Sequence, residues 1–407
     1  MKICFIADGN SIHSRRWIEY FCKPGNKIHI VSTTFCTNRM EGCTIHNLPQ
    51  PETREGDINK IAKYAIFRRV RESELFPLAY LSLLLYRTFK LTKKAKTIIE
   101  KLQPDLVHCL RLPIEGYIGG LVGYKPLVLT TWGNDMVYFA QKYSICRWLT
   151  RKAMSMASLY FADSLRDKYI AETYGFSCSN LTLEVPVTGG LKLEEFPMYQ
   201  KDSSIRKEAK RRLGIDPKTN MIISLRGFKF FYVNTEALVR AIPKITEVFP
   251  NTTFVLKGDM QLDAYYKMKE LAKELGAANN IRFTDKLSPR ELADYLLASD
   301  IMASVTLYDG CPISMLEGMA YGAIPVMSNH SPIQEWISDG WNGYLINPVN
   351  PSQIAETIIR ALKNKARFSL MRQRNWDILK QRADYYNNMA VVEQIYQQVV
   401  EGNREST

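Results

Sequence analysis

The sequence of 407 residues lacks the cysteine and histidine patterns of metal-binding and disulfide-rich proteins. Its eight cysteines contain no C-x-x-C pair, and none of its five histidines lies at zinc-finger spacing. Because the cysteines are scattered through apolar runs, they are typical of small core residues in a reducing compartment. This pattern excludes a structural zinc module and favours a cytoplasmic protein.

Long apolar segments are also missing. The first residues, MKICFIADGN, have no extended apolar region followed by a small-residue cleavage site, so we predict no signal peptide. The longest apolar run, residues 75–86, contains Pro77 and is too short to cross a bilayer. With 46% hydrophobic residues over 407 positions, the composition excludes disorder and suits two globular domains.

Two absent motifs exclude further classes of function. An NAD-dependent oxidoreductase built from Rossmann-like halves should carry G-x-G-x-x-G after its first strand, but ADGNSIHSRRW stands there. The net charge of +13 is not accompanied by a helix-turn-helix or a base-stacking sheet motif. We therefore predict neither a nicotinamide cofactor nor a nucleic-acid partner.

Much of the positive charge lies on both sides of the apolar stretch FPLAYLSLLLY. The basic residues are Lys60, Lys63, Arg68, Arg69, Arg71, Arg87, Lys90, Lys93, Lys94 and Lys96. Such a segment can bind an anionic membrane surface, and it can equally be a core helix with solvated basic ends. The first interpretation predicts a cytoplasmic protein bound peripherally to the inner face of the cell membrane.

Short apolar strands alternate with helical stretches in both halves of the chain. KICFIA, KIHIVST, DLVHC and LVLTT predict strands in the first half, and MIISLRG, TFVLKG, IRFT, DIMASV and AIPVMS predict strands in the second. This alternation predicts an α/β protein with two Rossmann-like, doubly wound parallel-sheet domains. Ligands bind beyond the carboxyl ends of such strands, so we expect an inter-domain cleft to hold the site.

The stretch of residues 185–204 interrupts this alternation with Pro186, Gly189, Gly190 and Pro197, and we interpret it as the connection between domains. We predict an acceptor-binding domain over residues 1–190 and a donor-binding domain over residues 205–375. Residues 376–407 are expected to form a helical segment that packs back on the N-terminal domain.

The residues most informative about chemistry lie between positions 298 and 348. A strand ends near Val305, and the loop TLYDGCP leads into a helix whose free backbone N–H groups favour an anion. Gly310 allows a ligand to approach the backbone closely. Asp309 and Glu317 can accept hydrogen bonds from sugar hydroxyls, and they can equally stabilise the helix N-terminus.

This stretch resembles the acid-x7-acid signature of family 4 retaining glycosyltransferases of the GT-B fold. EGMAYGAIPVMS is similar to the family's E-A-M-A-x-G-x-P-V block, and Glu335 with Gly343 resembles its E-x-V-x-x-G-x-x-G-x-L-V segment. VPVTGGLKLEEFPMY resembles the linker of the family, SLRGFKFFYVNTEALVRAI its donor-phosphate segment and MKICFIADGNSIHSRRWIEYF its N-terminal loop and helix. The resemblance therefore extends over most of the chain.

The resemblance implies a role for each matched position. Glu317 would bind the ribose and Asp309 the sugar of a UDP- or GDP-sugar, while Arg226 would neutralise the diphosphate. Gly310, Cys311, Pro312 and Ile313 would bind sugar and diphosphate through the backbone. Lys229 could substitute for the lysine that the family usually has where this chain has Phe231, and Gly258, at the end of a predicted strand, could line the nucleotide pocket. No cofactor and no metal are expected, because GT-B enzymes generally need none and the chain has no D-x-D triplet.

The N-terminal half offers candidates for the acceptor side or the cleft wall, namely Asn10, His13, Arg15, Trp132 and Asp135. Those of the first loop could meet the acceptor or the diphosphate. The family usually has His where this chain has Trp132 and Lys where it has Phe231, and its first acid is more often Glu than Asp. Trp132 could stack on a sugar or pack in the core. His108 closes a predicted strand and is expected to be a core or wall residue.

These features predict a retaining glycosyltransferase. It would transfer a sugar from a nucleotide-diphosphate sugar to a saccharide or a lipid-linked acceptor, in cell-envelope or exopolysaccharide synthesis. The alternative is a catalytically degenerate GT-B protein that acts as a non-catalytic partner, which the departures at Trp132 and Phe231 would favour.

Overall fold

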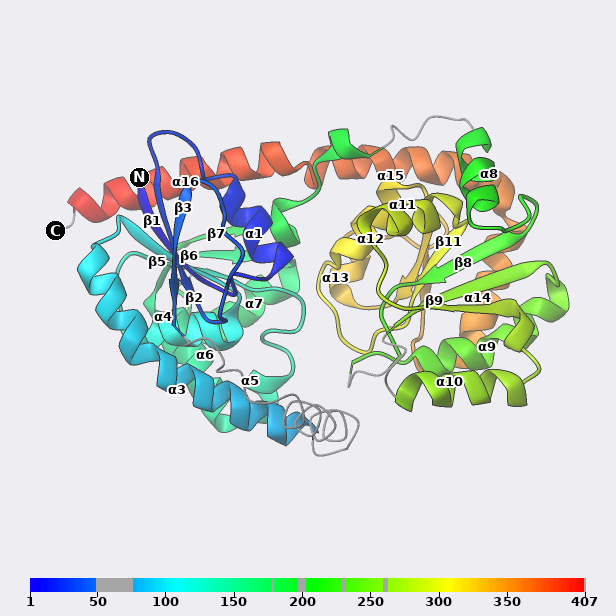
Figure 1. Cartoon of the computed structure of the whole chain (residues 1–407), viewed down its shortest axis with the longest axis horizontal. Coiled ribbons are helices and arrows are strands. Elements are labelled where there is room, and N and C mark those ends of the chain that lie inside the picture. Colours follow the sequence, from blue (N-terminus) through cyan, green and yellow to red (C-terminus); the bar gives the residue numbers. More distant parts are fainter. Residues whose placement is uncertain (49–75, 178, 197–202, 229–231, 259–262, 406–407) are drawn as a thin grey trace. The chain divides into compact units, whose positions relative to one another are not determined.

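The computed structural model describes residues 1–48, 76–177, 179–196, 203–228, 232–258 and 263–405. The chain forms two compact units (Figure 1). Unit 1 comprises Met1–Gly190 and Tyr385–Thr407, and unit 2 comprises Leu191–Asp384. The chain thus passes from unit 1 to unit 2 within the predicted connection, and it returns at residue 385 rather than at the predicted residue 376.

Unit 1 is built on a seven-stranded parallel sheet with the order β3-β2-β1-β4-β5-β6-β7. Its strands are β1 (Lys2–Ala7), β2 (Lys27–Ser32), β3 (Cys43–Asn47), β4 (Leu106–Leu110), β5 (Leu127–Thr130), β6 (Ala157–Ala162) and β7 (Leu181–Glu184). The central strands β1, β4 and β5 are mostly apolar and almost wholly buried, as expected for a parallel sheet covered on both faces.

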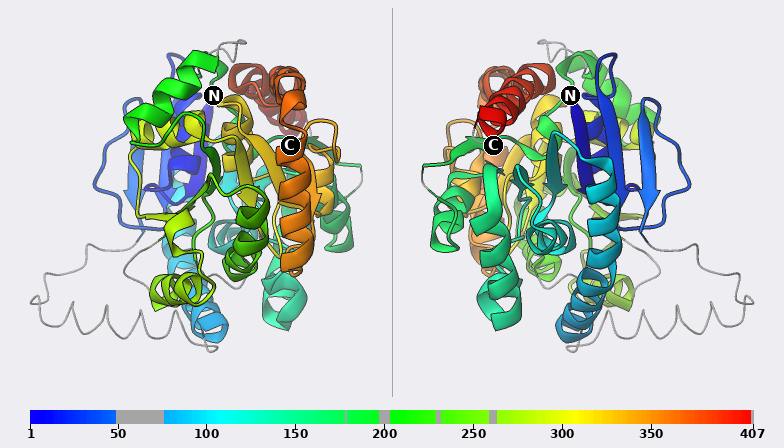
Figure 2. Two further views of the ribbon diagram at one scale, coloured as in Figure 1. Left: turned by 90° about the vertical axis from the view of Figure 1, so that its right-hand side faces the viewer. Right: turned by 90° about the vertical axis from the view of Figure 1, so that its left-hand side faces the viewer.

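Helices cover both faces of this sheet. They are α1 (Ile12–Glu19), α3 (Phe76–Leu102), α4 (Tyr117–Val122), α5 (Phe139–Lys142), α6 (Ser144–Met156), α7 (Leu165–Thr173) and α16 (Tyr385–Glu405). Apolar side chains of α3, α4 and α6 pack on one face, and those of α1 and α16 pack on the other. In the right-hand view of Figure 2, strands β1 to β3 are blue and α3 is the blue-cyan helix beside them.

Unit 2 contains a six-stranded parallel sheet with the order β10-β9-β8-β11-β12-β13. The strands are β8 (Asn220–Ser224), β9 (Thr252–Lys257), β10 (Ile281–Thr284), β11 (Ile301–Ser304), β12 (Ile324–Ser328) and β13 (Tyr344–Ile346). The helices are α8 (Ser203–Arg212), α9 (Thr235–Val248), α10 (Asp263–Glu274), α11 (Pro289–Ala298), α12 (Ile313–Ala320), α13 (Ser331–Gln334), α14 (Pro351–Lys363) and α15 (Phe368–Arg382).

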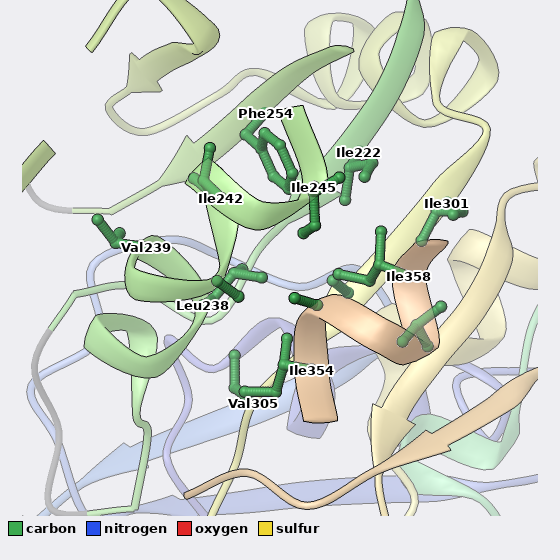
Figure 3. Packing of buried hydrophobic residues seen from close by; sticks show 14 of the residues in the cluster. Ile222, Leu238, Val239, Ile242, Ile245, Phe254, Ile301, Val305, Ile354 and Ile358 are labelled. Atoms are coloured by element: carbon green, nitrogen blue, oxygen red, sulfur yellow. The ribbon is translucent and has the colours of Figure 1, made fainter. Parts of the chain in front are cut away.

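The core of unit 2 is divided by its sheet. Ile222 faces the side covered by α9, α10 and α14, whereas its neighbours Met221 and Ile223 face α11, α12 and α15. Figure 3 shows the first side, where aliphatic side chains of α9 and α14 meet Ile222 of β8, Phe254 of β9 and Ile301 of β11. Successive side chains of a strand point to opposite faces of the sheet, so consecutive apolar residues contribute to the cores on its two sides.

Local sequence signals account for several helix boundaries of unit 2. Ser288 is the N-cap of α11 and forms a capping box with Glu291, and Pro289 is the first helical residue. The chain leaves α8 through Gly214, which has φ of +68°. In the part of the chain that the structure describes, no helix combines the length and the apolar composition needed to span a lipid bilayer.

Candidate functional site

The loop that follows β11 carries the first of the predicted acidic residues. The structure ends this strand at Ser304 and begins α12 at Ile313, so residues 305–312 form the connection at the carboxyl edge of the sheet. Asp309 is buried in this connection with only 4% of its surface exposed. Its Oδ1 accepts a hydrogen bond of 3.1 Å from the Gly310 backbone N–H, which fixes the carboxylate over the turn.

Arg226 lies directly against Asp309. It follows β8, the neighbour of β11 in the sheet, and its Nη2 donates to Asp309 Oδ2 at 2.5 Å. The Tyr232 ring lies 6.0 Å from the guanidinium carbon. The Arg226 Nε is buried and has no hydrogen-bond partner among the described residues. A buried donor without an acceptor costs roughly 1–3 kcal/mol, which an incoming anion would offset.

The start of α12 completes this arrangement. Pro312 is the N-cap, and no side chain of the described residues caps the helix, so the first turn keeps backbone N–H groups for a ligand. Ser314 lies in that turn, and its buried Oγ has no partner in the described part of the chain. Glu317 follows Ile313 by four residues, which places the two side chains on the same face of the helix.

The structure therefore brings together Arg226, Asp309 and the turn that enters α12, all within unit 2. Gly258 follows β9, but its N–H donates to the Thr284 carbonyl, and a Cβ there would lie 2.3 Å from the Phe228 ring. This contact gives a packing reason for the glycine. Lys229, like Phe231, lies outside the described residues.

Unit 1 has its own polar pocket at the carboxyl edge of its sheet. The pocket has a volume of about 180 Å³ and receives residues that follow β1, β2, β4 and β5. Its charged and aromatic lining residues are Asp8, His13, Arg87, Arg111, Glu115 and Trp132. Two of these, His13 and Trp132, were predicted for the acceptor side, and their rings lie 6.0 Å apart in an edge-on contact.

Glu115 is a buried acidic residue of this pocket. Burial raises the pKa of its carboxyl group to about 7, although a 2.6 Å hydrogen bond from the Thr33 hydroxyl favours the charged form. Burial and the positive charges of Arg16 and Arg111 lower the pKa of His13. The backbone beside Glu115 is unusual, because Arg111 and Ile114 have φ of 97° and 71°. Such strain at non-glycine residues clusters at functional sites.

The remaining N-terminal candidates lie outside the lining of this pocket. Asn10 donates to Thr34 Oγ1 and to the Phe35 carbonyl, and Arg15 donates to three backbone carbonyls of nearby loops. Asp135 is buried and accepts hydrogen bonds from Arg111 Nε and from the backbone N–H of Trp132. Asp135 thus positions two pocket residues. The Trp132 Nε1 is buried without a partner among the described residues.

His108 is a core residue, as predicted. It is fully buried, its Nε2 lies 2.6 Å from Thr130 Oγ1, and its Nδ1 is hydrogen-bonded to the Tyr396 hydroxyl. Burial lowers its pKa well below the usual value, so the ring stays neutral.

Sequence reasoning did not identify Asp8, Arg111 or Glu115 as pocket residues, and it assigned Arg87 only to the basic segment. Each of Asp8, Arg111 and Glu115 follows a strand within five residues, at the edge where parallel sheets bind ligands. Glu115 stands out in RLPIEGY as a single carboxylate within an apolar stretch. An isolated carboxylate in an apolar stretch that follows a strand is the sequence feature that could have indicated this pocket residue.

Comparison with solved structures defines the fold class. The chain aligns with HepE from Anabaena, solved in complex with UDP, with a TM-score of 0.70 and 16% identity over 98% of this chain and 100% of the other. Sucrose-phosphate synthase from Thermosynechococcus elongatus aligns with a TM-score of 0.77 and 16% identity over 99% and 100% of the two chains. The fold is therefore the GT-B architecture, with two parallel-sheet α/β domains.

Sequence comparison finds similarity to glycosyltransferases in both halves of the chain. A model described as "Glycosyl transferases group 1" matches residues 205–377, and one described as "Glycosyl transferase 4-like" matches residues 77–164. An uncharacterized glycosyltransferase of Methanocaldococcus jannaschii is 27% identical over 44% of this chain and 47% of its own length. The aligned region thus spans about half of that relative. Residues 205–377 of this chain thus resemble the group 1 glycosyltransferases.

A further relative has a more specific name. The GDP-mannose:cellobiosyl-diphosphopolyprenol alpha-mannosyltransferase of Komagataeibacter xylinus is 25% identical over 33% of this chain and 34% of its own length.

Proposed function

We propose that the protein transfers a sugar from a UDP- or GDP-sugar to a saccharide or lipid-linked acceptor, with retention of the anomeric configuration. Cell-envelope or exopolysaccharide synthesis is the proposed setting. The observation that carries the proposal is the Arg226–Asp309 pair at 2.5 Å beside the uncapped start of α12. This arrangement offers positive charge and backbone N–H groups to a diphosphate and a carboxylate to sugar hydroxyls.

In this proposal, each donor contact has a chemical task. Arg226 binds the diphosphate and stabilises the negative charge that develops on it as the sugar leaves. The first turn of α12 binds the same group through its N–H groups, and Glu317 accepts hydrogen bonds from the ribose. Positive charge comes from the protein itself, so the proposal requires no metal ion. The crystallised complexes of HepE with UDP and with UDP-glucose support a nucleotide sugar as donor.

We assign the acceptor to the unit 1 pocket. The carboxylates of Asp8 and Glu115 and the cations of Arg87 and Arg111 suit a polar, hydroxylated ligand of small size. A larger groove of about 1140 Å³ shares Thr33, Thr34 and Arg87 with the pocket and continues along α3. An acceptor with a sugar end and an apolar tail would use both. The Komagataeibacter relative, whose name specifies a diphosphopolyprenol-linked acceptor, supports this class.

The exposed side of α3 supports attachment to an anionic membrane surface. Leu83, Tyr86 and Phe89 are each about half exposed, and Lys90 and Lys93 are exposed beside them. Apolar groups next to lysines bind the boundary of anionic bilayers. The lysines at positions 60 and 63 lie outside the described residues, so the proposal is argued from α3 alone.

The donor assignment is tested by nucleotide binding. We expect UDP or GDP, but not NAD, to raise the melting temperature of the wild-type protein by mass-action linkage. The variant Arg226→Ala should lose this rise and most of the transfer activity. Arg240→Ala is the matched control, because Arg240 pairs with Glu236 on the exposed side of α9 in the same unit. A nucleotide-dependent rise that is undiminished in Arg226→Ala would refute the donor site.

Activity assays on the wild-type protein distinguish an active transferase from a non-catalytic partner. A panel of nucleotide sugars should reveal hydrolysis or transfer with one donor, and the proton NMR spectrum of the product should show the anomeric configuration of that donor. Nucleotide binding without turnover for any donor would instead support the degenerate alternative, and an inverted product would contradict retention.

Membrane attachment is tested by sedimentation with vesicles. The double variant Lys90→Glu/Lys93→Glu should lose binding to anionic vesicles, whereas Lys267→Glu/Lys269→Glu on exposed positions of α10 should keep it. Equal binding of the wild type to neutral and anionic vesicles would remove this part of the proposal.

A further inference from the structure

A second cationic pocket lies in unit 2, away from the proposed donor site. It has a volume of about 230 Å³, and its described lining contains five cationic side chains and a single carboxylate, that of Asp300. The cations are Arg206, Lys207, Lys210, Lys365 and Arg372. Positive charge thus exceeds negative charge by four among these lining residues.

The pocket lies at the amino edge of the sheet. Its residues contact Thr219, Asp300 and Gly322, which precede β8, β11 and β12, three neighbouring strands. Arg226 and Asp309 follow the opposite, carboxyl ends of β8 and β11. A strand of four or five residues spans roughly 15 Å, and the two sites lie at opposite ends of these strands. The pocket is therefore distinct from the donor site.

Asp300 is the anionic centre of the pocket and is already used by two lysines. Lys210 Nζ lies 2.9 Å from Asp300 Oδ2, and Lys365 Nζ lies 3.1 Å from Oδ1. The other contacts of these cations are to neutral groups: Lys210 also donates to the Thr219 carbonyl and Lys365 to Asn220 Oδ1. Neutral acceptors satisfy donors but do not compensate charge.

The two arginines bind the backbone that precedes β11 and β12. Arg206 donates to the carbonyls of Ser299 and Tyr321, and Arg372 Nε donates to the Gly322 carbonyl at 2.8 Å. Arg206 is itself 93% buried, with 7% of its surface exposed. These contacts fix the positions of the guanidinium groups at the wall of the pocket, which is the preorganisation that a charged ligand needs.

Burial and neighbouring charges both act on the pKa values of Lys210 and Asp300. Burial lowers the pKa of Lys210 despite its contact with Asp300, and the charges of Lys365 and Arg206 lower it further. Burial acts to raise the pKa of Asp300, but Lys210, Lys365 and Arg206 outweigh it and bring the value to about 2. One carboxylate therefore stays ionised at any physiological pH, beside five cations of the described lining.

We propose that this pocket binds a phosphate dianion, either free or as the monoester of a small metabolite. Two negative charges on one tetrahedral group match an excess of several cations better than a carboxylate does. Lys207 is exposed on the rim and has no ion-pair partner among the described residues, so it is placed to close over the ligand. The inference does not depend on the proposed transferase activity.

The experiment is isothermal titration of the whole protein with inorganic phosphate and with glucose 6-phosphate, at constant ionic strength set with sodium chloride. We expect saturable binding of at least one of them, and the tighter of the two identifies the source of the phosphate. The variant Lys207→Ala/Lys365→Ala should weaken binding about tenfold or more, because two charge-assisted contacts are lost. Lys218→Ala, an exposed lysine beside the pocket, is the matched control.

Arg226→Ala separates this site from the donor site. Phosphate binding should be retained in Arg226→Ala, while UDP or GDP binding should be retained in Lys207→Ala/Lys365→Ala. If the double variant does not fold, Lys207→Ala alone carries the test, since its side chain is exposed. The proposal is overturned if neither inorganic phosphate nor glucose 6-phosphate gives a saturable signal, or if binding survives the pocket variants and is lost in Arg226→Ala.

Discussion

Asp309 determines where the Arg226 guanidinium lies, so its charge should matter for turnover. In Asp309→Asn the arginine loses its ionised partner at 2.5 Å while the size of the side chain is kept. We expect kcat to fall roughly 10²-fold, as for the loss of one preorganised charged contact. The free energy of unfolding should fall by only about 1–3 kcal/mol.

Transfer kinetics with the preferred donor and urea unfolding measure the two effects. Asp377→Asn is the control, because Asp377 forms an exposed pair with Lys380 on α15 of the same unit. Wild-type kcat in Asp309→Asn at saturating donor would show that the carboxylate is not part of the site.

Glu115 should make the stability of unit 1 fall as the pH rises. Its pKa is about 7 in the folded protein and 4.5 as the reference value, so the folded state holds a proton that the unfolded state releases between these values. The loss of stability caused by ionising Glu115 in the folded protein is absent below pH 4.5 and complete above pH 7. A shift of this size corresponds to roughly 3 kcal/mol.

The variant Glu115→Gln should therefore be more stable than the wild type above pH 7, and the difference should shrink toward pH 4.5. Urea unfolding at a series of pH values measures it, with Glu100→Gln on the exposed side of α3 as control. A difference that does not change with pH would mean that Glu115 ionises normally.

At the level of elements, the contact between α4 and α6 depends on the absence of a side chain. A Cβ added to Gly120 of α4 would lie 2.6 Å from the Ala153 Cα of α6, a backbone atom that cannot rotate away. Gly120→Ala should destabilise unit 1 by roughly 1–3 kcal/mol or more through overpacking.

Gly402 offers the opposite case within unit 1. It lies in α16, and a Cβ there would meet nothing within 4 Å. Gly402→Ala should be neutral or stabilising by up to about 1 kcal/mol because alanine favours the helix. Thermal unfolding of both variants measures the contrast, and equal melting temperatures would contradict the close packing of α4 on α6.

The helices and strands that could be predicted from the sequence have strong local signals, such as a buried apolar run or a helix cap. The strands that were missed lack such signals. β1 and β11 are buried apolar runs, and α11 begins with a complete capping box. β3 and β7 are edge strands of four or five half-exposed residues, so their apolar pattern is weak. β6 follows α6 without an intervening loop, and a boundary of that kind has no turn residues to mark it.

The same reasoning applies to the candidate site. Asp309, Gly310 and Glu317 lie within nine residues of one another, so a local motif could indicate them, and Arg226 stands in a matching segment. The unit 1 pocket instead collects Asp8, Arg87 and Glu115 from β1, α3 and the stretch after β4. Only the order of the strands brings these residues together, and no local sequence pattern predicts that order.

At the level of the whole molecule, α16 is essential to unit 1 although it follows unit 2 in sequence. Tyr385, Met389 and Tyr396 are buried in the core formed with α1 and β1, and Tyr396 is hydrogen-bonded to His108 and lies 3.3 Å from Trp17 Nε1. A chain that ends at Asp384 should lose cooperative unfolding of unit 1 while unit 2 keeps its own transition.

Calorimetry measures this prediction as the loss of one of two transitions, with nucleotide stabilisation of unit 2 as the marker that the remaining unit is native. Removal of residues 403–407 alone is the control and should leave both transitions in place. If both transitions persist in the truncated chain, unit 1 folds without α16 and this prediction is wrong.

Because unit 1 is assembled from the two ends of the chain, synthesis and folding cannot follow the same order. At roughly 5–20 residues per second, a ribosome needs about 10–40 s to translate the 194 residues between Gly190 and Tyr385. Throughout this interval the nascent N-terminal half is incomplete, with the apolar face that α16 later covers open to chaperones and proteases. The domain whose synthesis begins first is thus the one that matures last.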